Sequence, residues 1–509
     1  MSEERSSAGW TAAVLAVIVA KLAVHAAVHP AYGFHRDELL YLSMADHFDL
    51  FRMQFPPMIA MFGRLANAIG AGPDGPLTAV RAIAALASTL LLLFTVLLAG
   101  TMGGGGPARL LAAAAVLAAP VFLRAGTLLQ PVVLEQLWWT AAVYAFARLL
   151  AGRDRRWWVG VGLALGLGAL TKFSVAFLGV GLAAATIASP LRIDLRSRWP
   201  WLALALGAVL AIPSVTGQIA WSWPFFAQMA ALKAAQLARA SRLDFVTGQL
   251  TMLGSAAPVA LAGLIALIAY RRLAAFRALA VLYLVAAALL LAGHAKEYYL
   301  APLAPLLLAA GAVGLGRLPR IPYALLLVVV LAGGAALVPI GTPVLPPASM
   351  ARYAARLGIT RTLKTNTGAS LPLPQDYADM IGWGPMVDAV GAVYRALPPD
   401  ERRRVMIFAG NYGEAGALQV LGTRRGLPEP ISVAGDFFHW GPGMLPGEIL
   451  IAIGAPRDRL LRIYGRCDQR GVFDHPWMVD EEHHSPILVC RDARQTLQQL
   501  WPRIGPQWG

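Results

Sequence analysis

Long apolar runs dominate the first two thirds of the sequence, and only short polar stretches separate most of them. A run of about 20 apolar residues is the length that an α-helix needs to span a bilayer. The run at 157–189 is too long for one span and carries Thr171 and Lys172 at its middle, so we expect two helices there with a tight turn between them. The pattern predicts an α-helical integral membrane protein with about 11 transmembrane helices. The apolar runs are 10–29, 78–100, 107–124, 131–150, 157–189, 199–218, 249–270, 276–294, 298–316 and 320–340.

Two of the polar connections are long enough to hold structure of their own. In the 30–77 connection, residues 37–50 have apolar side chains at helical spacing, and Pro56 and Pro57 follow them. They predict an amphipathic helix in the membrane interface, and 58–69 predicts a second short helix. The 219–248 connection begins with four aromatic residues and continues with cationic ones, which also indicates an interfacial helix.

The composition changes after Gly341, where PVLPP reads as a linker and a more polar sequence follows. We expect residues 1–343 to form the membrane domain and residues 344–509 to form a soluble C-terminal α/β domain. Short apolar β-branched runs predict strands, and helical spacing predicts helices between them. The expected strands are 404–408, 448–453 and 487–491, and the expected helices are 388–397, 415–421 and 457–466.

Charge adds an orientation to this picture. Of the 509 residues, 57% are hydrophobic and only 14% are charged, yet the formal net charge is +15. Arginine-rich short loops at 148–156, 192–198, 271–277 and 317–320 all fall on one side under this span count, which is the pattern of cytoplasmic loops. The basic charge therefore needs no nucleic-acid partner. The first apolar run lacks a basic n-region and a cleavage site, so it reads as a retained span. We expect a cytoplasmic N-terminus and an extracytoplasmic C-terminal domain.

The two cysteines, Cys467 and Cys490, both lie in the C-terminal domain. A disulfide between them fits an extracytoplasmic location. Their spacing does not match a zinc site.

An adjacent acidic pair, Asp37 and Glu38, follows the first span, with His35 and Tyr41 close by. Carboxylates at an apolar interface are costly unless they face water, a metal or a polar partner. One of them could serve as a general base that activates an acceptor hydroxyl or amine. Alternatively, the pair only favours the N-terminus of the interfacial helix. Adjacent residues point in different directions on a helix, so we expect only one of the pair to enter a site.

Several cations fall on the same side as this pair. Lys296, in HAKEYYLAPLAP, could bind a phosphate as a point charge, with Tyr298 or Tyr299 lining the same pocket. The alternative is that these residues are interface anchors. Further candidate anion ligands, each of which could instead snorkel to the interface, are Lys172, Arg81 and Arg124.

The GNYGEAG segment at 410–416 follows an expected strand and precedes an expected helix. It lacks the lysine and the glycine spacing of phosphate-binding loops, and Glu414 would repel a phosphate. Nucleotide binding is therefore disfavoured.

Taken together, these motifs resemble one enzyme family. The first span followed by FHRDELLYL and Pro56-Pro57, and later KEYYLAPLAP, is similar to glycosyltransferase family 39. This family includes protein mannosyltransferases and lipid A aminoarabinose transferases of the GT-C fold. The resemblance covers nearly the whole chain, and the Asp-Glu pair is its most specific mark. QDYADMIGW at 375–383 and GNYGEAG look like the C-terminal domain of one bacterial subgroup.

The resemblance implies sugar transfer from a polyprenyl-phosphate-sugar donor at the outer face of the bacterial inner membrane. The acceptor would be a lipid, polysaccharide or protein of the cell envelope. Asp37 matches the catalytic carboxylate with Glu38 as its companion, and Lys296 and Tyr298 match the segment that meets the donor phosphate. Where aminoarabinose transferases carry Glu-Lys-Pro, this chain has QFPP at 54–57, so we hypothesise that Lys172 or Arg81 compensates for the missing lysine.

The sequence requires no cofactor, although His35, Asp37 and Glu38 could hold a divalent metal ion. Two other classes of function remain open. A lipid or sugar transporter would be favoured by charges at the bilayer midplane and by paired broken helices. A non-catalytic scaffold would use the C-terminal domain for binding. The clustering of charges at span ends favours the enzyme.

Overall fold

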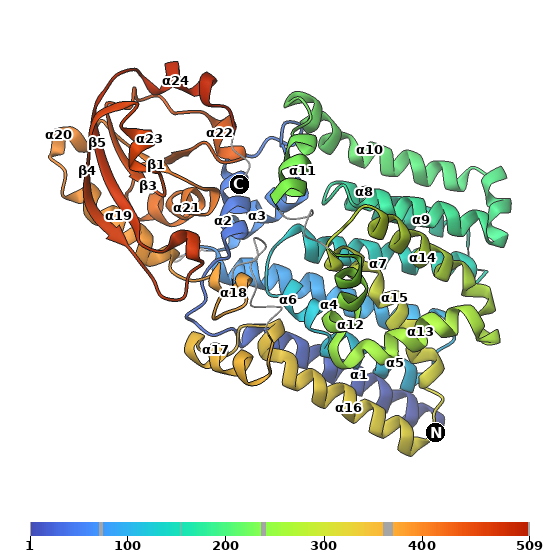
Figure 1. Cartoon of the computed structure of the whole chain (residues 1–509). Coiled ribbons are helices and arrows are strands. Elements are labelled where there is room, and N and C mark those ends of the chain that lie inside the picture. The colour runs from blue at the N-terminus through green and yellow to red at the C-terminus, as the bar shows by residue number, and fades with distance from the viewer. Residues whose placement is uncertain (1, 71–74, 153, 236–240, 360–369, 507–509) are drawn as a thin grey trace.

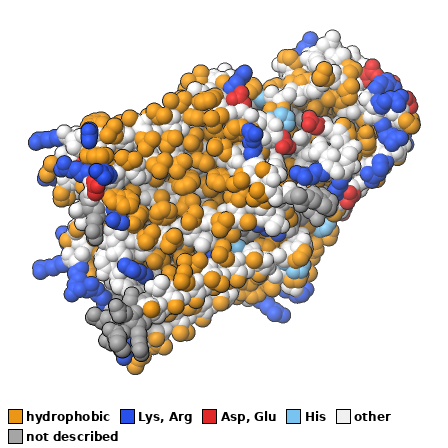
Figure 2. All heavy atoms as spheres, turned by 180° about the vertical axis from the view of Figure 1, so that it is seen from behind, with side chains coloured by type: hydrophobic (Ala, Val, Ile, Leu, Met, Phe, Trp, Pro, Cys, Tyr) orange, Lys and Arg blue, Asp and Glu red, His pale blue; other side chains and the backbone are white. Residues whose placement is uncertain are grey.

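The computed structural model describes residues 2–70, 75–152, 154–235, 241–359 and 370–506. Long helices form a bundle, and a smaller sheet-containing part lies against one end of it (Figure 1). The N-terminus lies at the opposite end. Figure 2 shows a wide hydrophobic surface on one face of the bundle, with Lys and Arg side chains at the bundle end remote from the C-terminal part and on the C-terminal part itself. This distribution is that of a protein whose bundle sits in a bilayer.

Each predicted apolar run forms helix. The helices of the bundle are α1 (Ser2–Ala26), α4 (Leu77–Thr101), α5 (Gly106–Ala118), α6 (Pro120–Ala125), α7 (Pro131–Leu150), α8 (Trp157–Ala169), α9 (Val175–Ile187), α10 (Trp199–Ala220), α12 (Arg242–Leu253), α13 (Ala257–Ala269), α14 (Arg277–Ala292), α15 (Ala304–Leu315) and α16 (Arg320–Gly341).

Within the described residues, 7 helices are long and apolar enough to cross a membrane, or 8 if the bent pair of α9 and the 3-10 helix Pro190–Arg196 forms one span. The multi-pass helical membrane architecture is therefore confirmed. The number falls below the predicted 11 mainly because several runs form shorter helices, such as α5 and α8 with 13 residues each. The predicted break at Thr171 and Lys172 is present, since α8 ends at Ala169 and α9 begins at Val175.

The helices predicted in the polar connections are also present. In the first connection they are α2 (Arg36–Asp46) and α3 (Met58–Ile69). In the second, α11 (Pro224–Ala235) follows Trp221 and Trp223 and includes Phe225 and Phe226, and α12 begins at Arg242. Residues 236–240 of that connection, including Arg239, lie outside the described residues.

The C-terminal part contains a five-stranded mixed sheet in the order β2-β1-β3-β5-β4. β2, β1 and β3 are parallel, whereas β5 is antiparallel to both β3 and β4. The strands are β1 (Val405–Ala409), β2 (Pro430–Ser432), β3 (Ile449–Ile453), β4 (Tyr464–Phe473) and β5 (Ser485–Ala493). The helices around them are α17 (Pro347–Arg356), α18 (Gln375–Ala378), α19 (Trp383–Arg395), α20 (Pro399–Arg402), α21 (Tyr412–Ala417), α22 (Asp436–Trp440), α23 (Arg457–Leu460) and α24 (Leu497–Ile504).

The three predicted strands are confirmed, but the helix predicted at 457–466 is wrong over its second half. α23 ends at Leu460, and β4 begins at Tyr464 because this segment pairs with β5. Cys467 lies opposite Cys490 in that ladder, and the two form the disulfide that the cysteine count suggested.

Two close approaches fix α2 between the bundle side and the C-terminal part. Gly63 of α3 faces α2 so closely that a Cβ there would lie 2.9 Å from the Tyr41 carbonyl oxygen. On the other side, a Cβ on Gly416 of α21 would lie 2.8 Å from the Leu39 Cβ. Larger residues at these glycines would push the helices apart. The helix that carries the acidic pair is therefore clamped from two sides.

Candidate functional site

The acidic pair lies in the first turn of α2, which begins with a capping box. The backbone N–H of Asp37 donates to the His35 Nδ1, and the His35 N–H donates to the Glu38 Oε2 at 2.9 Å. Such reciprocal bonds satisfy N–H groups that a helix start leaves without partners. The sequence therefore sets where α2 begins, and this fixes the directions of the two carboxylates.

Asp37 and Glu38 point into different environments, as expected for neighbours on a helix. Glu38 is buried, and its second oxygen accepts from the Leu129 N–H at 2.8 Å. Burial raises the pKa of Glu38 above its ordinary value, although the backbone N–H groups of His35 and Leu129 oppose the shift. Asp37 keeps 29% of its side chain exposed. Asp37 is thus the carboxylate of the pair that a substrate can reach.

Two side chains from distant segments orient Asp37. The Tyr412 hydroxyl at the start of α21 donates to its Oδ1 at 3.0 Å, and the Gln130 amide donates to its Oδ2 at 2.9 Å. Both bonds use acceptor lone pairs and leave others on each oxygen available, because a carboxylate can accept about four. The carboxylate is therefore held in one orientation and still open to a proton donor.

Of the predicted cations, Lys296 lies within electrostatic reach of Asp37. The charges of Asp37, Asp376 and Lys172 all act on the ammonium of Lys296, which precedes the 3-10 helix Glu297–Leu303. Burial is the largest influence and lowers the pKa of Lys296, whereas the carboxylates of Glu297, Asp376 and Asp37 oppose the shift. The half-buried ammonium of Lys296, near the partly exposed carboxylate of Asp37, is a suitable ligand for a phosphate.

Lys172, in the turn between α8 and α9, has strong partners of its own. Its Nζ lies 2.9 Å from the buried Glu135 Oε2. The same ammonium lies 4.4 Å from the ring centre of Tyr299 and 5.4 Å from that of Tyr298. These contacts place Lys172 and the two predicted tyrosines in one cluster, with its charge balanced by Glu135.

The other predicted cations are engaged elsewhere. Arg81, at the start of α4, donates to the carbonyl oxygens of Tyr32 and Gly33, so it supports the loop that precedes α2. Arg124 of α6 forms an ion pair with Asp376. Burial alone would raise the pKa of Asp376, but the Arg124 guanidinium outweighs it and lowers that pKa.

The residues proposed for a metal do not converge on one point. His35 Nδ1 and both oxygens of Glu38 already accept backbone N–H groups, and His35 Nε2 lies 3.8 Å from an Asp379 oxygen. In the part of the chain that the structure describes, no group of three or more His, Cys, Asp or Glu residues could hold a metal ion. These residues therefore do not fit a metal, and no step is assigned to one.

Tyr41 lies one turn after Asp37 on α2. Burial is the main influence that raises its pKa, and the charges of Asp37, Tyr412 and Asp436 add to the shift. Tyr41 is therefore a neutral phenol, and it lies within electrostatic reach of both Asp37 and Asp436.

The sequence did not single out Arg36, which joins α2 to the C-terminal part. Its guanidinium pairs with Asp379 at 2.7 Å and with Glu481 and Glu482 at 3.3 and 3.4 Å. No sequence signal assigned a role to Gln130, Tyr412 or Asp376, although the last two lie in the GNYGEAG and QDYADMIGW segments. Their only signal was position, since Tyr412 lies in the GNYGEAG segment and Gln130 precedes a helix-starting proline.

The GNYGEAG segment is not arranged for phosphate. Its glutamate, Glu414, turns back and accepts from the backbone N–H groups of Gly410 and Asn411 at 2.8 and 3.2 Å. Asn411 caps α21 in the same way that His35 caps α2. The carboxylate of Glu414 thus occupies the N–H groups that a phosphate would need.

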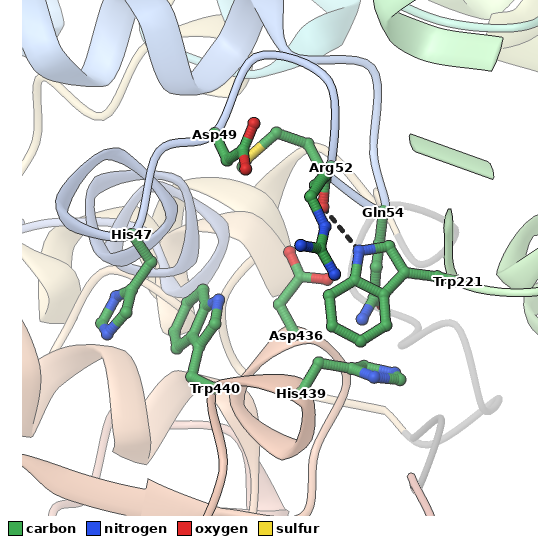
Figure 3. Close-up of a pocket in the computed structure, with 9 residues that line it drawn as sticks. His47, Asp49, Arg52, Gln54, Trp221, Asp436, His439 and Trp440 are labelled. Atoms are coloured by element: carbon green, nitrogen blue, oxygen red, sulfur yellow. Dashed lines mark hydrogen bonds between the residues drawn. The ribbon is translucent and has the colours of Figure 1, made fainter. Parts of the chain in front are cut away.

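A pocket lies at the C-terminal end of α2 (Figure 3). It has a volume of about 260 Å³. Its lining residues are His47, Asp49, Arg52, Met53, Gln54, Trp221, Asp436, His439 and Trp440. Asp436 lies in its wall, and burial raises the pKa of this carboxyl group to about 7.

We expect Asp436→Asn to stabilise the protein at alkaline pH. The unfolded pKa of an aspartate is about 3.9, so the folded protein binds this proton more tightly, and wild-type stability falls as the pH rises from about 4 to 7. Asparagine does not titrate. At pH 8, the free energy of unfolding of Asp436→Asn should exceed that of wild type by on the order of a few kcal/mol, and its thermal midpoint should be higher. At pH 4, the difference in stability between the two proteins should be smaller. Thermal unfolding of both proteins at pH 4 and pH 8 measures this difference. A stability difference that does not change with pH would contradict the prediction.

Comparisons with known proteins agree with this architecture. The family described as dolichyl-phosphate-mannose-protein mannosyltransferase matches residues 54–216. A comparison with curated proteins found no match. The crystal structure of ArnT from Cupriavidus metallidurans bound to undecaprenyl phosphate is similar, with a TM-score of 0.60, 16% identity, and coverage of 95% of this chain and 98% of that chain. Its apo structure gives a TM-score of 0.56 at 17% identity, with the same coverage. The chain has the GT-C glycosyltransferase fold.

Proposed function

We propose that this GT-C protein is a membrane glycosyltransferase that moves a sugar from a polyprenyl-phosphate-linked donor to a cell-envelope acceptor, with Asp37 as general base. The match to a mannosyltransferase family and the likeness to a protein solved with undecaprenyl phosphate support the donor class. The single observation that carries the role of Asp37 is its placement. It is oriented by Tyr412 and Gln130 and partly open, while its neighbour Glu38 is committed to the helix cap.

The reaction needs one bond made and one broken at the anomeric carbon. The acceptor O–H or N–H gives its proton to Asp37, and the freed electron pair attacks the anomeric carbon. The bond from that carbon to the phosphate oxygen breaks, and the lipid phosphate leaves with the electron pair. Direct displacement of this kind inverts the anomeric centre. Cations beside the phosphate stabilise the charge that develops on the leaving group.

Lys296 is the cation that we assign to the donor phosphate. Lys172 balances Glu135, and Arg81 is bonded to backbone carbonyl groups, so the hypothesis that either one alone replaces the missing lysine near 54–57 loses support. Lys172, with Tyr298 and Tyr299, forms a wall beside Lys296, and we propose that this wall positions the phosphate.

We expect Lys296→Gln to raise the KM for the lipid donor by about 10-fold or more, since a hydrogen bond to a charged group is worth about 1.5–3 kcal/mol. Lys233→Gln, on the exposed face of α11, is the matched control and should leave the KM unchanged. Steady-state transfer at varied donor concentration gives both values. An unchanged KM in Lys296→Gln would remove this lysine from the phosphate site.

The orientation is part of the proposal. Cationic side chains gather at the bundle end remote from the C-terminal part (Figure 2), which supports a cytoplasmic N-terminus by the positive-inside rule. A disulfide in the C-terminal part supports an oxidising location for it. We therefore place Asp37 and the C-terminal part at the outer face of a bacterial inner membrane.

The test is release of free polyprenyl phosphate by the purified full-length chain. The protein is incubated with a mixed pool of polyprenyl-phosphate sugars and a cell-envelope extract that supplies acceptors. Release that depends on both components is the expected result. Absence of release from every donor would contradict the proposed function.

A further inference from the structure

The hollow at the end of α2 is a built pocket that the transfer chemistry at Asp37 does not use. One wall is the C-terminal end of α2 with the segment that follows it, and the opposite wall is α22 of the C-terminal part (Figure 3). Trp221, at the end of α10, closes one side. Three segments far apart in the sequence therefore meet around a volume of about 260 Å³.

Buried polar groups in this pocket lack protein partners. Asp436 is 3% exposed, and neither of its carboxylate oxygens has a hydrogen-bond partner. Gln54 is 6% exposed, and its side-chain amide is likewise unsatisfied, as is His439 Nε2. Leaving a buried polar group unsatisfied destabilises the folded protein. Such a cost is expected where a ligand supplies the missing bonds.

Aromatic rings form the other surfaces of the pocket, and they are held in place. Trp440 stacks on His47 with ring centres 4.0 Å apart, and Trp221 meets His439 edge-on at 4.4 Å. The indole N–H of Trp221 donates to the Arg52 carbonyl oxygen. The rings therefore present fixed apolar faces next to the unsatisfied carboxylate and amide.

We propose that this pocket binds a neutral sugar ring through its hydroxyl groups. A sugar has apolar C–H faces that pack on Trp221 and Trp440, and hydroxyl groups that donate to Asp436 and bond to Gln54. The unsatisfied groups of the pocket are a carboxyl group, an amide and an imidazole nitrogen, which are hydrogen-bonding partners suited to hydroxyl groups. A metal ion is disfavoured because the described residues offer no cluster of three ligands.

The pocket and the proposed reaction centre lie at opposite ends of α2. The role of the pocket in sugar transfer rests on the proposed function, whereas sugar binding itself does not. His47 is ten residues beyond Asp37 and caps the same helix, which corresponds to about 15 Å at 1.5 Å per residue. A sugar seated here is remote from the bond being formed. It belongs either to an acceptor saccharide chain or to a donor that carries more than one sugar.

The test measures binding directly and needs no transfer. Fluorescently labelled maltotriose, cellotriose and mannotriose are titrated with the full-length chain, purified in a detergent without a sugar headgroup, and anisotropy is recorded. At least one probe should bind saturably to wild type. Asp436→Asn should weaken that binding by at least 10-fold, and Arg52→Ala, an exposed residue of the rim, should weaken it several-fold.

Asp458→Asn, on the exposed surface of α23, is the matched control and should bind as wild type does. Failure of wild type to bind any probe, or equal binding by wild type and Asp436→Asn, would overturn the inference. Asp37→Asn should bind the probe normally. If transfer is absent in every protein while Asp436-dependent binding persists, the proposed function fails and the sugar pocket stands.

A competition arm separates the two sources of the sugar. The bound probe is challenged with the mixed polyprenyl-phosphate-sugar pool. Displacement assigns the pocket to the donor, and retention assigns it to the acceptor saccharide. Both results are consistent with a pocket that binds a neutral sugar ring.

Discussion

Asp37→Asn is expected to slow sugar transfer by about 10²- to 10⁴-fold, the contribution of a positioned general base. Asparagine keeps the shape of the side chain and can still accept from the Tyr412 hydroxyl, so α2 should stay in place. It cannot take the acceptor proton. The loss should therefore appear in kcat, while the KM for the lipid donor changes little. The measurement is the rate of polyprenyl phosphate release at saturating donor.

The matched control for this variant is Asp46→Asn in the last turn of the same helix. Asp46 is exposed and accepts from the Asn67 amide, far along α2 from the first turn. This variant should transfer sugar at the wild-type rate. Equal rates for wild type and Asp37→Asn would exclude Asp37 as the base, and a loss confined to KM would instead indicate a role in binding.

Arg36→Met is expected to cause the largest loss of stability, about 3–5 kcal/mol, because it removes one partner of a buried ion network. The side chains of Asp379 and Glu482 are 3% and 0% exposed, so both carboxylates would remain buried without their cation. The guanidinium carbon of Arg36 also lies 6.0 Å from the ring centre of Trp383 and 5.9 Å from that of Tyr412, so methionine removes these cation–π contacts together with the ion pairs. Thermal unfolding of the detergent-solubilised chain measures the change.

Arg404→Met provides the comparison on the surface of the same part. Arg404 and its partner Glu448 are 52% and 54% exposed, and exposed pairs contribute about 0–1 kcal/mol. If the two variants unfolded at the same temperature, the Arg36 network would not be a determinant of stability.

Much of the fold could be predicted from the sequence because hydrophobic spacing is a local signal. The apolar runs, α2, α3 and three of the five strands all follow from such spacing. The first three residues of β4 were mistaken for helix because the strand character of β4 depends on pairing with β5 and on the bond between Cys467 and Cys490. Those partners lie 12 to 29 positions further along the chain, from Phe473 with Ser485 to Tyr464 with Ala493, beyond any local pattern.

The candidate site could be predicted only in part, for the same reason. The pair Asp37 and Glu38 stood out by adjacency, but only the capping box and the Leu129 N–H show which of the two is buried. The partner of Lys172 is Glu135, which is hidden inside an apolar run. The sugar pocket likewise joins Gln54, Trp221 and Asp436 from three segments. Pairings of this kind are set by tertiary structure rather than by sequence neighbourhood.

The clamping of α2 has a consequence for how the protein is made. Asp37 is oriented by Tyr412, and Arg36 is neutralised by Glu481 and Glu482, so the first helix after the first span depends on residues close to the end of the chain. Chains fold from the N-terminus during synthesis. A nascent chain can insert its whole helical bundle and still lack an assembled acidic site. Under the proposed function, the segment that carries Tyr412, Glu481 and Glu482 must be synthesised before sugar can be transferred, and a product terminated before Tyr412 should be inactive.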